Sequence, residues 1–134
     1  MRGKDALNIY QQTQIKTLSQ GKLIIMLYDG AIKNLTLALK EMEEKNYEQT
    51  NNYLIKAQEI INELAVTLNL DAGELAHNLL RLYRSMNALL VQANIKNDQD
   101  IVKRVVKMLS ELRQAWATIN YDASSPERGG VASA

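Results

Sequence analysis

The chain has no cysteine, and its single proline, Pro126, stands close to the C-terminus. The absence of cysteine excludes disulfide bonds and thiolate metal sites, and it is compatible with a reducing compartment. Glycine is also scarce, with 6 in 134 residues. Because proline and glycine are the residues that most disfavour a helix interior, a chain so poor in both is expected to be almost entirely helical.

Neither sign of charge is in marked excess, since 16 basic and 15 acidic residues give a formal net charge of +1. No basic face for nucleic acid is therefore predicted. The longest apolar run is far shorter than the roughly 20 residues that span a bilayer, and the N-terminal residues MRGKDALN do not form a signal peptide. We expect a cytosolic protein that does not insert into membranes, with one domain at this length.

The apolar residues recur at helical spacing in four segments. The first is expected from Ser19, as N-cap, to Lys45, and the others cover about residues 47–68, 72–96 and 99–121. Asp71 is the N-cap candidate of the third segment. Short connections make consecutive helices antiparallel neighbours, so the predicted fold is all-α, an antiparallel up-down four-helix bundle. Residues 1–18 are expected to form an N-terminal cap segment, 19–121 the bundle and 122–134 a disordered tail.

Each predicted helix carries more apolar surface than its inward face needs, most clearly in the stretch KLIIMLYDGAI from Lys22 to Ile32. In the third helix, an inward face from Leu75 to Leu90 leaves other aliphatic residues outside it. The surplus residues are open to several interpretations. They are isolated exposed aliphatic residues, part of a thicker core, covered by the N-terminal segment, or the lining of grooves for an amphipathic helix of another chain. The surplus residues are Leu23 and Met26 in the first helix, Ile55 and Val66 in the second, and Val91 and Ile95 in the third.

The one motif that suggests catalysis is Glu74-x-x-His77, whose spacing occurs in di-iron helical bundles. Those sites need the motif on two helices, and His77 is the only histidine of the chain. Both residues fall opposite the predicted inward face, so we expect them on the surface. Asp29 is expected to be a surface carboxylate or a support for a neighbouring loop. No phosphate-binding loop or catalytic pair is visible, and we predict no enzyme activity, no cofactor and no metal.

A set of short motifs in fixed order runs through most of the chain. It begins with Tyr10-x4-Ile15-x-Thr17-x-Ser19 and with LIIMLYDGAI at 23–32. It continues with LIKAQ and IINEL in 54–64, GELA, NL and LY in 73–83, AN and ND in 93–98, and Trp116. In this order the motifs resemble the FliS family, the flagellin-specific secretion chaperones, over about residues 10–120. One departure is Gln20, where the family often has proline, which weakens a helix start only slightly.

The resemblance implies a helical bundle that binds the disordered C-terminal segment of flagellin in the bacterial cytosol. It implies that this prevents premature polymerisation and keeps flagellin competent for flagellar type III secretion, with a contact to the export gate. It also implies that the N-terminal segment, with Tyr10, can cover part of the binding surface in the free protein.

The hypothesis that follows is a displaceable lid, in which Tyr10 and Ile15 cover a groove until flagellin binds. The alternative, that both belong permanently to the core, stays open. So do two other functions, a self-associating bundle that forms a homodimer and a chaperone or adaptor for another flagellar client or regulator. The residues predicted to bind the partner are Tyr10, Ile15, Leu23, Met26, Ile55, Val66, Val91 and Ile95.

Overall fold

The computed structural model describes the backbone of residues 2–124 and the side chains of residues 20–119. No strand occurs within residues 2–124, which confirms the all-α prediction. The elements in chain order are α1 (Arg2–Glu43), α2 (Tyr47–Val66), the short 3-10 helix η1 (Leu70–Ala72), α3 (Glu74–Lys96) and α4 (Gln99–Ser124).

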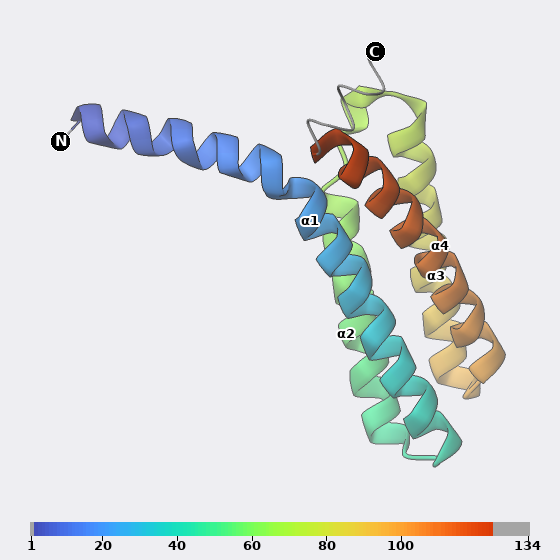
Figure 1. Cartoon of the computed structure of the whole chain (residues 1–134). Coiled ribbons are helices and arrows are strands. Elements are labelled where there is room, and N and C mark those ends of the chain that lie inside the picture. Colours follow the sequence, from blue (N-terminus) through green and yellow to red (C-terminus); the bar gives the residue numbers. More distant parts are fainter. Residues whose placement is uncertain (1, 125–134) are drawn as a thin grey trace.

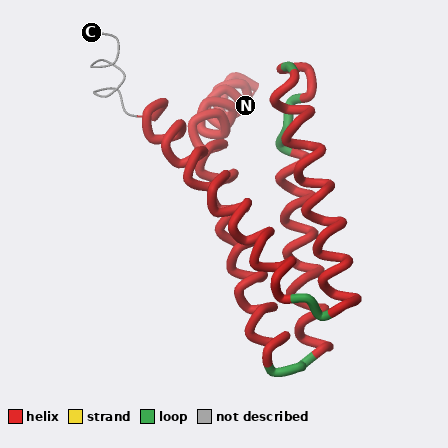
Figure 2. Tube along the Cα trace, turned by 90° about the vertical axis from the view of Figure 1, so that its right-hand side faces the viewer, coloured by secondary structure: helices red, strands yellow, loops and turns green. Residues whose placement is uncertain are grey.

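The four α-helices pack as a ring, in which each helix contacts the next along the chain and α4 returns to contact α1 (Figures 1 and 2). Consecutive helices run in opposite directions because their connections are short. The predicted antiparallel up-down four-helix bundle is therefore confirmed.

Asparagine and aspartate side chains build the turns at one end of the bundle. Lys45 and Asn97 adopt left-handed backbone conformations, with φ of 58° and 52°, and end α1 and α3. The Oδ1 of Asn46 accepts the hydrogen bond that caps α2, and the Oδ1 of Asp98 accepts from the backbone N–H of Ile101 in the first turn of α4. These caps close the end of the bundle at which α1 meets α2 and α3 meets α4.

The first helix begins earlier than the sequence analysis predicts, at Arg2 instead of Ser19, so Ser19 is not an N-cap. Residues 2–18 contain no proline, and nothing in their sequence stops a helix outright. The N-terminal part of α1 extends away from the other three helices (Figure 1). The side chains of residues 1–19 lie outside the described ones, so the cap formed by 1–18 stays a prediction. Of the predicted tail, α4 takes up the part to Ser124 and the rest lies outside the described residues.

The connection between α2 and α3 also differs from the prediction. Asp71 does not cap α3, because it lies inside η1, where its backbone N–H donates to the Oδ1 of Asn69 over 3.1 Å. The residue before α3 is instead Gly73, whose φ of 122° lies in a region that favours glycine. The asparagine therefore forms a local turn of its own, and α3 starts without a side-chain cap.

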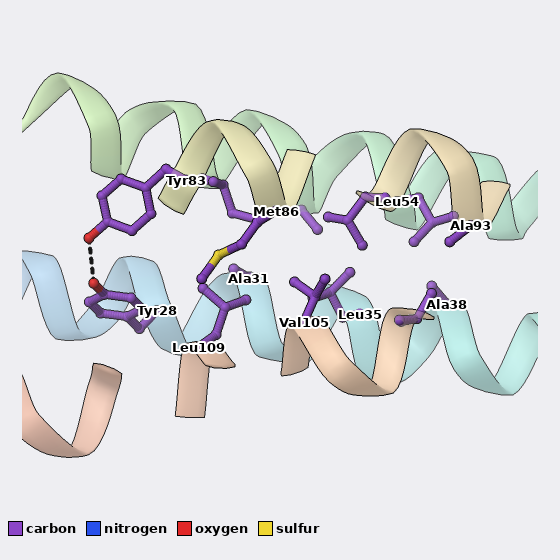
Figure 3. Close-up of a cluster of buried hydrophobic side chains, with 14 of the residues drawn as sticks. Tyr28, Ala31, Leu35, Ala38, Leu54, Tyr83, Met86, Ala93, Val105 and Leu109 are labelled. Atoms are coloured by element: carbon purple, nitrogen blue, oxygen red, sulfur yellow. Dashed lines mark hydrogen bonds between the residues drawn. The ribbon is translucent and has the colours of Figure 1, made fainter. Parts of the chain in front are cut away.

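The core lies along the axis of the bundle and has contributions from all four α-helices (Figure 3). Alanines in it let neighbouring helices approach closely. At Gly30, α1 lies close to α2, since a Cβ placed there would lie 3.3 Å from Cδ1 of Ile60. The largest fully buried side chains are Tyr28, Leu35, Met42, Leu54, Ile61, Leu64, Met86, Leu90, Leu109, Val102, Val105 and Thr50.

Candidate functional site

The surplus aliphatic residues that the sequence singles out on α1, α2 and α3 are exposed, as predicted. Their exposed fractions range from 42% for Ile55 to 79% for Ile95. Tyr10 and Ile15, the other two predicted partner-binding residues, lie outside the residues whose side chains are described. Of these six exposed residues, Leu23 and Met26 lie on α1 and the remaining four lie on α2 and α3.

Two hydrogen bonds between asparagines define how α2 and α3 face each other. The Nδ2 of Asn94 donates to the Oδ1 of Asn51 over 2.6 Å, and the Nδ2 of Asn87 donates to the Oδ1 of Asn62 over 2.9 Å. Ile55 lies between the two asparagines of α2, and Val91 lies between the two of α3. We call these side chains the α2–α3 seam: Asn51, Ile55 and Asn62 with Asn87, Val91 and Asn94.

A second apolar surface lies at the opposite end of the bundle from the capped turns. It is an open pocket of about 410 Å³ between the middle of α1, the end of α2, η1, the start of α3 and the end of α4. We call it the terminal pocket. Its lining residues are Gln20, Gly21, Ile24, Thr67, Leu68, Asn69, Ala72, Leu75, Ala76, Leu79, Tyr83, Trp116 and Ile119.

The terminal pocket corrects one assignment of the sequence analysis. Leu75 is expected on the inward face of α3, but it is 73% exposed at the pocket, together with Ile119 at 60%. Helical periodicity alone assigns Leu75 to the core. In space, however, it lies in the first turn of α3, where no described residue covers it. Sequence reasoning missed the pocket because a helical wheel shows which side of a helix is apolar but not where the neighbouring helices end.

Two tyrosine hydroxyls meet beneath the pocket. The hydroxyls of Tyr28 on α1 and Tyr83 on α3 form a hydrogen bond of 2.5 Å across the core (Figure 3). Burial raises the pKa of Tyr28 well above its ordinary value, and its hydrogen bond with Tyr83 raises it further. Burial also raises the pKa of Tyr83. Both hydroxyls therefore stay protonated at neutral pH, and the base of the pocket carries no charge.

On the outside of the bundle, a salt bridge links α1 to α4. The Nε of Arg113 donates to Oδ1 of Asp29 over 2.9 Å, and its Nη2 donates to Oδ2 over 3.3 Å. The carboxylate raises the pKa of Arg113. Asp29 is thus a surface carboxylate, one of its two expected roles, and its partner is a neighbouring helix and not a loop.

The described residues contain no group of three or more His, Cys, Asp and Glu side chains that could hold a metal ion. Glu74 and His77 are exposed, as expected. Among the described residues, no helix is both long and apolar enough to span a bilayer. The two apolar surfaces, with hydroxyl and amide groups beside them, are suited to binding another chain.

Comparison with known proteins places these features in a family. The model of the family "Flagellar protein FliS" matches residues 3–123 of this chain. The flagellar secretion chaperone FliS of Bacillus subtilis is 42% identical over 107 residues, which cover 80% of each chain. The proteins of the same name from Campylobacter jejuni and Escherichia coli are 32% identical over 121 residues and 35% identical over 107 residues. These matches cover 90% and 78% of this chain, and 94% and 79% of the two relatives.

Proposed function

Since this chain belongs to the FliS family of flagellar secretion chaperones, we propose that it binds the C-terminal segment of flagellin in the bacterial cytosol. Binding would prevent premature polymerisation and keep flagellin competent for flagellar type III secretion. The terminal pocket is the observation that carries this proposal, because it is an open and mainly apolar site of about 410 Å³ at one end of the bundle.

The apolar residues available are sufficient for tight binding of a segment that folds as it binds. Burying one aliphatic side chain fully contributes roughly 1.5–3 kcal/mol, and ordering a disordered partner costs about 2–5 kcal/mol or more. At these values about five or six anchors give tight binding. Leu75 and Ile119 at the pocket, with the exposed aliphatic residues of α1, α2 and α3, exceed that number. An amphipathic client segment would cover them and leave its own charged side chains in solvent.

The N-terminal segment joins the bundle beside the terminal pocket, but in the structure it extends away from the other three helices, so a lid requires this segment to fold back. Gln20 and Gly21 line the pocket, so residues 1–18 are joined to the bundle at its edge. Such a short connection gives the segment a high effective concentration at the pocket. We propose that Tyr10 and Ile15 cover the pocket in the free protein and leave it when flagellin binds.

Titration with two forms of flagellin tests the function. Full-length monomeric flagellin is expected to bind, and flagellin without its C-terminal segment is expected not to bind. Trp116 is the only tryptophan and lines the pocket, so its fluorescence should change with the first form alone. Equal binding of both forms would exclude the C-terminal segment as the ligand.

Deletion of residues 1–16 tests the lid separately. If the segment is a lid, the shortened chain should keep its thermal midpoint and bind the flagellin segment more tightly. A large loss of stability with unchanged affinity per folded molecule would instead assign Tyr10 and Ile15 to the core.

Charge substitution tests the predicted partner-binding residues of α2 and α3. Because Ile55 and Val91 are 42% and 46% exposed, Ile55→Asp and Val91→Asp should leave the thermal midpoint nearly unchanged. Each should weaken binding of a flagellin C-terminal peptide about tenfold, measured by calorimetry. Unchanged affinity in both variants would remove this pair from the binding surface.

Self-association is a second candidate, favoured by the large number of exposed aliphatic side chains on a free chain. Sedimentation of the protein alone and with flagellin separates the two. A homodimer that dissociates when flagellin binds would place both partners on the same surface, whereas a dimer that persists in the complex would place them on different surfaces.

A further inference from the structure

Of the described residues that line the terminal pocket, Tyr83 is the only one that is almost fully buried and carries a polar side chain. It is 2% exposed and therefore belongs to the base of the pocket. Two other polar residues of the lining, Gln20 and Asn69, are exposed to solvent. The hydroxyl of Thr67 already donates to the carbonyl of Leu64 over 2.6 Å. No residue of the lining carries a charge at neutral pH.

The two hydroxyl hydrogens of the buried tyrosine pair cannot both be used inside the bundle. The hydrogen bond between Tyr28 and Tyr83 takes up one of them (Figure 3). If Tyr83 donated to Tyr28, the hydrogen of Tyr28 would have no outlet, because Tyr28 is 0% exposed and does not line the pocket. If Tyr28 donates to Tyr83, the remaining hydrogen belongs to Tyr83, which does line the open pocket. The second arrangement is the one that leaves no hydroxyl buried without a partner.

The acidities of the two hydroxyls agree with this direction. Burial raises the pKa of both tyrosines, and their mutual hydrogen bond raises the pKa of Tyr28 further while it lowers that of Tyr83. A donor becomes harder to ionise because it would lose the bond, and an acceptor becomes easier to ionise because the bond stabilises its anion. The nearby indole N–H of Trp116 lowers the pKa of Tyr28 in part, as a donor to the same oxygen does. The donors thus follow one another from Trp116 through Tyr28 to Tyr83.

A donor at the base of the pocket restricts what can fill the pocket. Because the pocket is open, water can accept the hydrogen of Tyr83 in the free protein. An occupant that displaces this water must bring an acceptor, or the donor is buried without a partner. An aliphatic side chain has no acceptor, and a carboxylate would lose hydration in a lining without positive charge. The group that fits is an uncharged oxygen, that of an amide or a hydroxyl.

We infer that Tyr83 determines the specificity of the terminal pocket, because its hydroxyl donates a hydrogen bond to an uncharged side-chain oxygen of the flagellin C-terminal segment. This inference rests on the proposed function. The acceptor comes from a side chain, since the main-chain carbonyls of an amphipathic helix are bonded internally. The apolar walls of the pocket, including Leu75 and Ile119, contribute affinity, and Tyr83 selects for an asparagine, glutamine, serine or threonine at one position of the client.

Removal of single hydroxyls tests this role. Tyr83→Phe removes the donor and keeps the ring, and calorimetry with a synthetic flagellin C-terminal peptide should show affinity about five- to tenfold lower per folded molecule. Tyr28→Phe leaves the donor in place without the bond that orients it, so the loss should be no more than about threefold. Tyr53→Phe is the matched control, since Tyr53 is half-buried and does not line the pocket, and its affinity should stay within about twofold.

Replacement of polar residues in the peptide provides the second measurement. Each asparagine, glutamine, serine and threonine is exchanged singly for an apolar residue of similar size. On the unmodified chaperone, one exchange should weaken binding about fivefold or more. The same exchange should change the affinity of the Tyr83→Phe chaperone by less than about twofold, because the two groups form one interaction.

A third measurement needs no variant of the chaperone and applies even if Tyr83→Phe does not fold. In protein labelled with carbon-13 at the tyrosine Cζ, the chemical shift of Tyr83 follows the hydrogen bonding of its hydroxyl. It should move when the unmodified peptide binds and should move differently with the peptide that lacks the acceptor.

The outcomes separate the two proposals. Failure of the unmodified chaperone to bind the peptide would overturn the proposed function, and this inference with it. If the peptide binds, three results show that the inference alone is wrong. These are a Tyr83→Phe affinity within about twofold of the Tyr53→Phe control, an equal loss in Tyr28→Phe and Tyr83→Phe, and a Cζ shift that is the same with every peptide.

Discussion

Both ends of the bundle have apolar residues at helical spacing, but the two ends differ in how far these side chains are buried. At the end with the turns between α1 and α2 and between α3 and α4, Met42, Leu54 and Val102 are at most 1% exposed. At the other end, Leu75 and Ile119 are 73% and 60% exposed. The first end is closed by capped turns that bring four helix termini together, whereas at the second a 3-10 connection stands beside a helix that leaves the bundle (Figure 1). The arrangement of helix ends thus decides whether an apolar residue is core or binding site.

The largest expected effect compares two leucines of the same helix. Leu90 is fully buried and Leu75 is exposed at the terminal pocket, although both fit the apolar periodicity of α3. Leu90→Ala should reduce the free energy of unfolding by about 2–5 kcal/mol, because it leaves a cavity in a packed core. Leu75→Ala should change it by less than about 0.5 kcal/mol and should weaken binding of the flagellin segment. Chemical denaturation and calorimetry measure the two quantities.

Equal destabilisation by these two substitutions would contradict the comparison, because it would mean that Leu75 is covered in solution. The N-terminal segment is the part of the chain joined to the bundle at the pocket. Repeating the measurement on a chain without residues 1–16 would show whether that segment provides the cover.

The closed parts of the fold could be predicted from the sequence because they depend on local rules. Periodicity identifies the inward residues of α1 and α2, and the scarcity of glycine and proline predicts the helices. The exposure of Ile55, Val66, Val91 and Ile95 follows from the same wheels, since these residues fall outside the inward stripes. The family follows from motifs in a fixed order, and the comparisons confirm it.

The open end could not be predicted in the same way, because it depends on where helices stop relative to one another. Asp71 has a side chain that commonly caps helices. Its backbone N–H, however, donates to the Oδ1 of Asn69, and Asp71 lies inside η1. Ser19 likewise resembles an N-cap, but the helix passes through it because the residues before it are also compatible with a helix. The hydrogen bonds of the α2–α3 seam need the register of two helices, which no single helical wheel contains.

The next effect concerns the two tyrosine hydroxyls beneath the pocket. Tyr28→Phe or Tyr83→Phe alone leaves a buried hydroxyl without its partner and should cost about 1–3 kcal/mol, whereas the double variant should cost less than the two single variants together. The pair also predicts a pH dependence. Since folding raises both pKa values above 10.0, the unfolded chain releases these protons first as pH rises.

Stability should therefore be independent of this pair below about pH 10 and should fall above it, by about 1.4 kcal/mol per pH unit for each tyrosine that stays protonated when folded. Denaturation between pH 8 and 11 measures the slope. The double phenylalanine variant is the control and should show a smaller slope. Equal slopes would mean that the hydroxyls ionise as easily in the folded bundle as in the unfolded chain.

The smallest effect is expected for the salt bridge between α1 and α4. Asp29 and Arg113 have side chains that are 53% and 41% exposed, so solvent screens their attraction. Asp29→Asn should lower the thermal midpoint by no more than about 2 °C, and the difference should vanish in 1 M salt, where the screening length is about 3 Å. A shift that is larger, or that persists in salt, would mean that this pair holds α1 against α4 beside the pocket. The open end would then depend on surface charge as well as on the buried tyrosine pair.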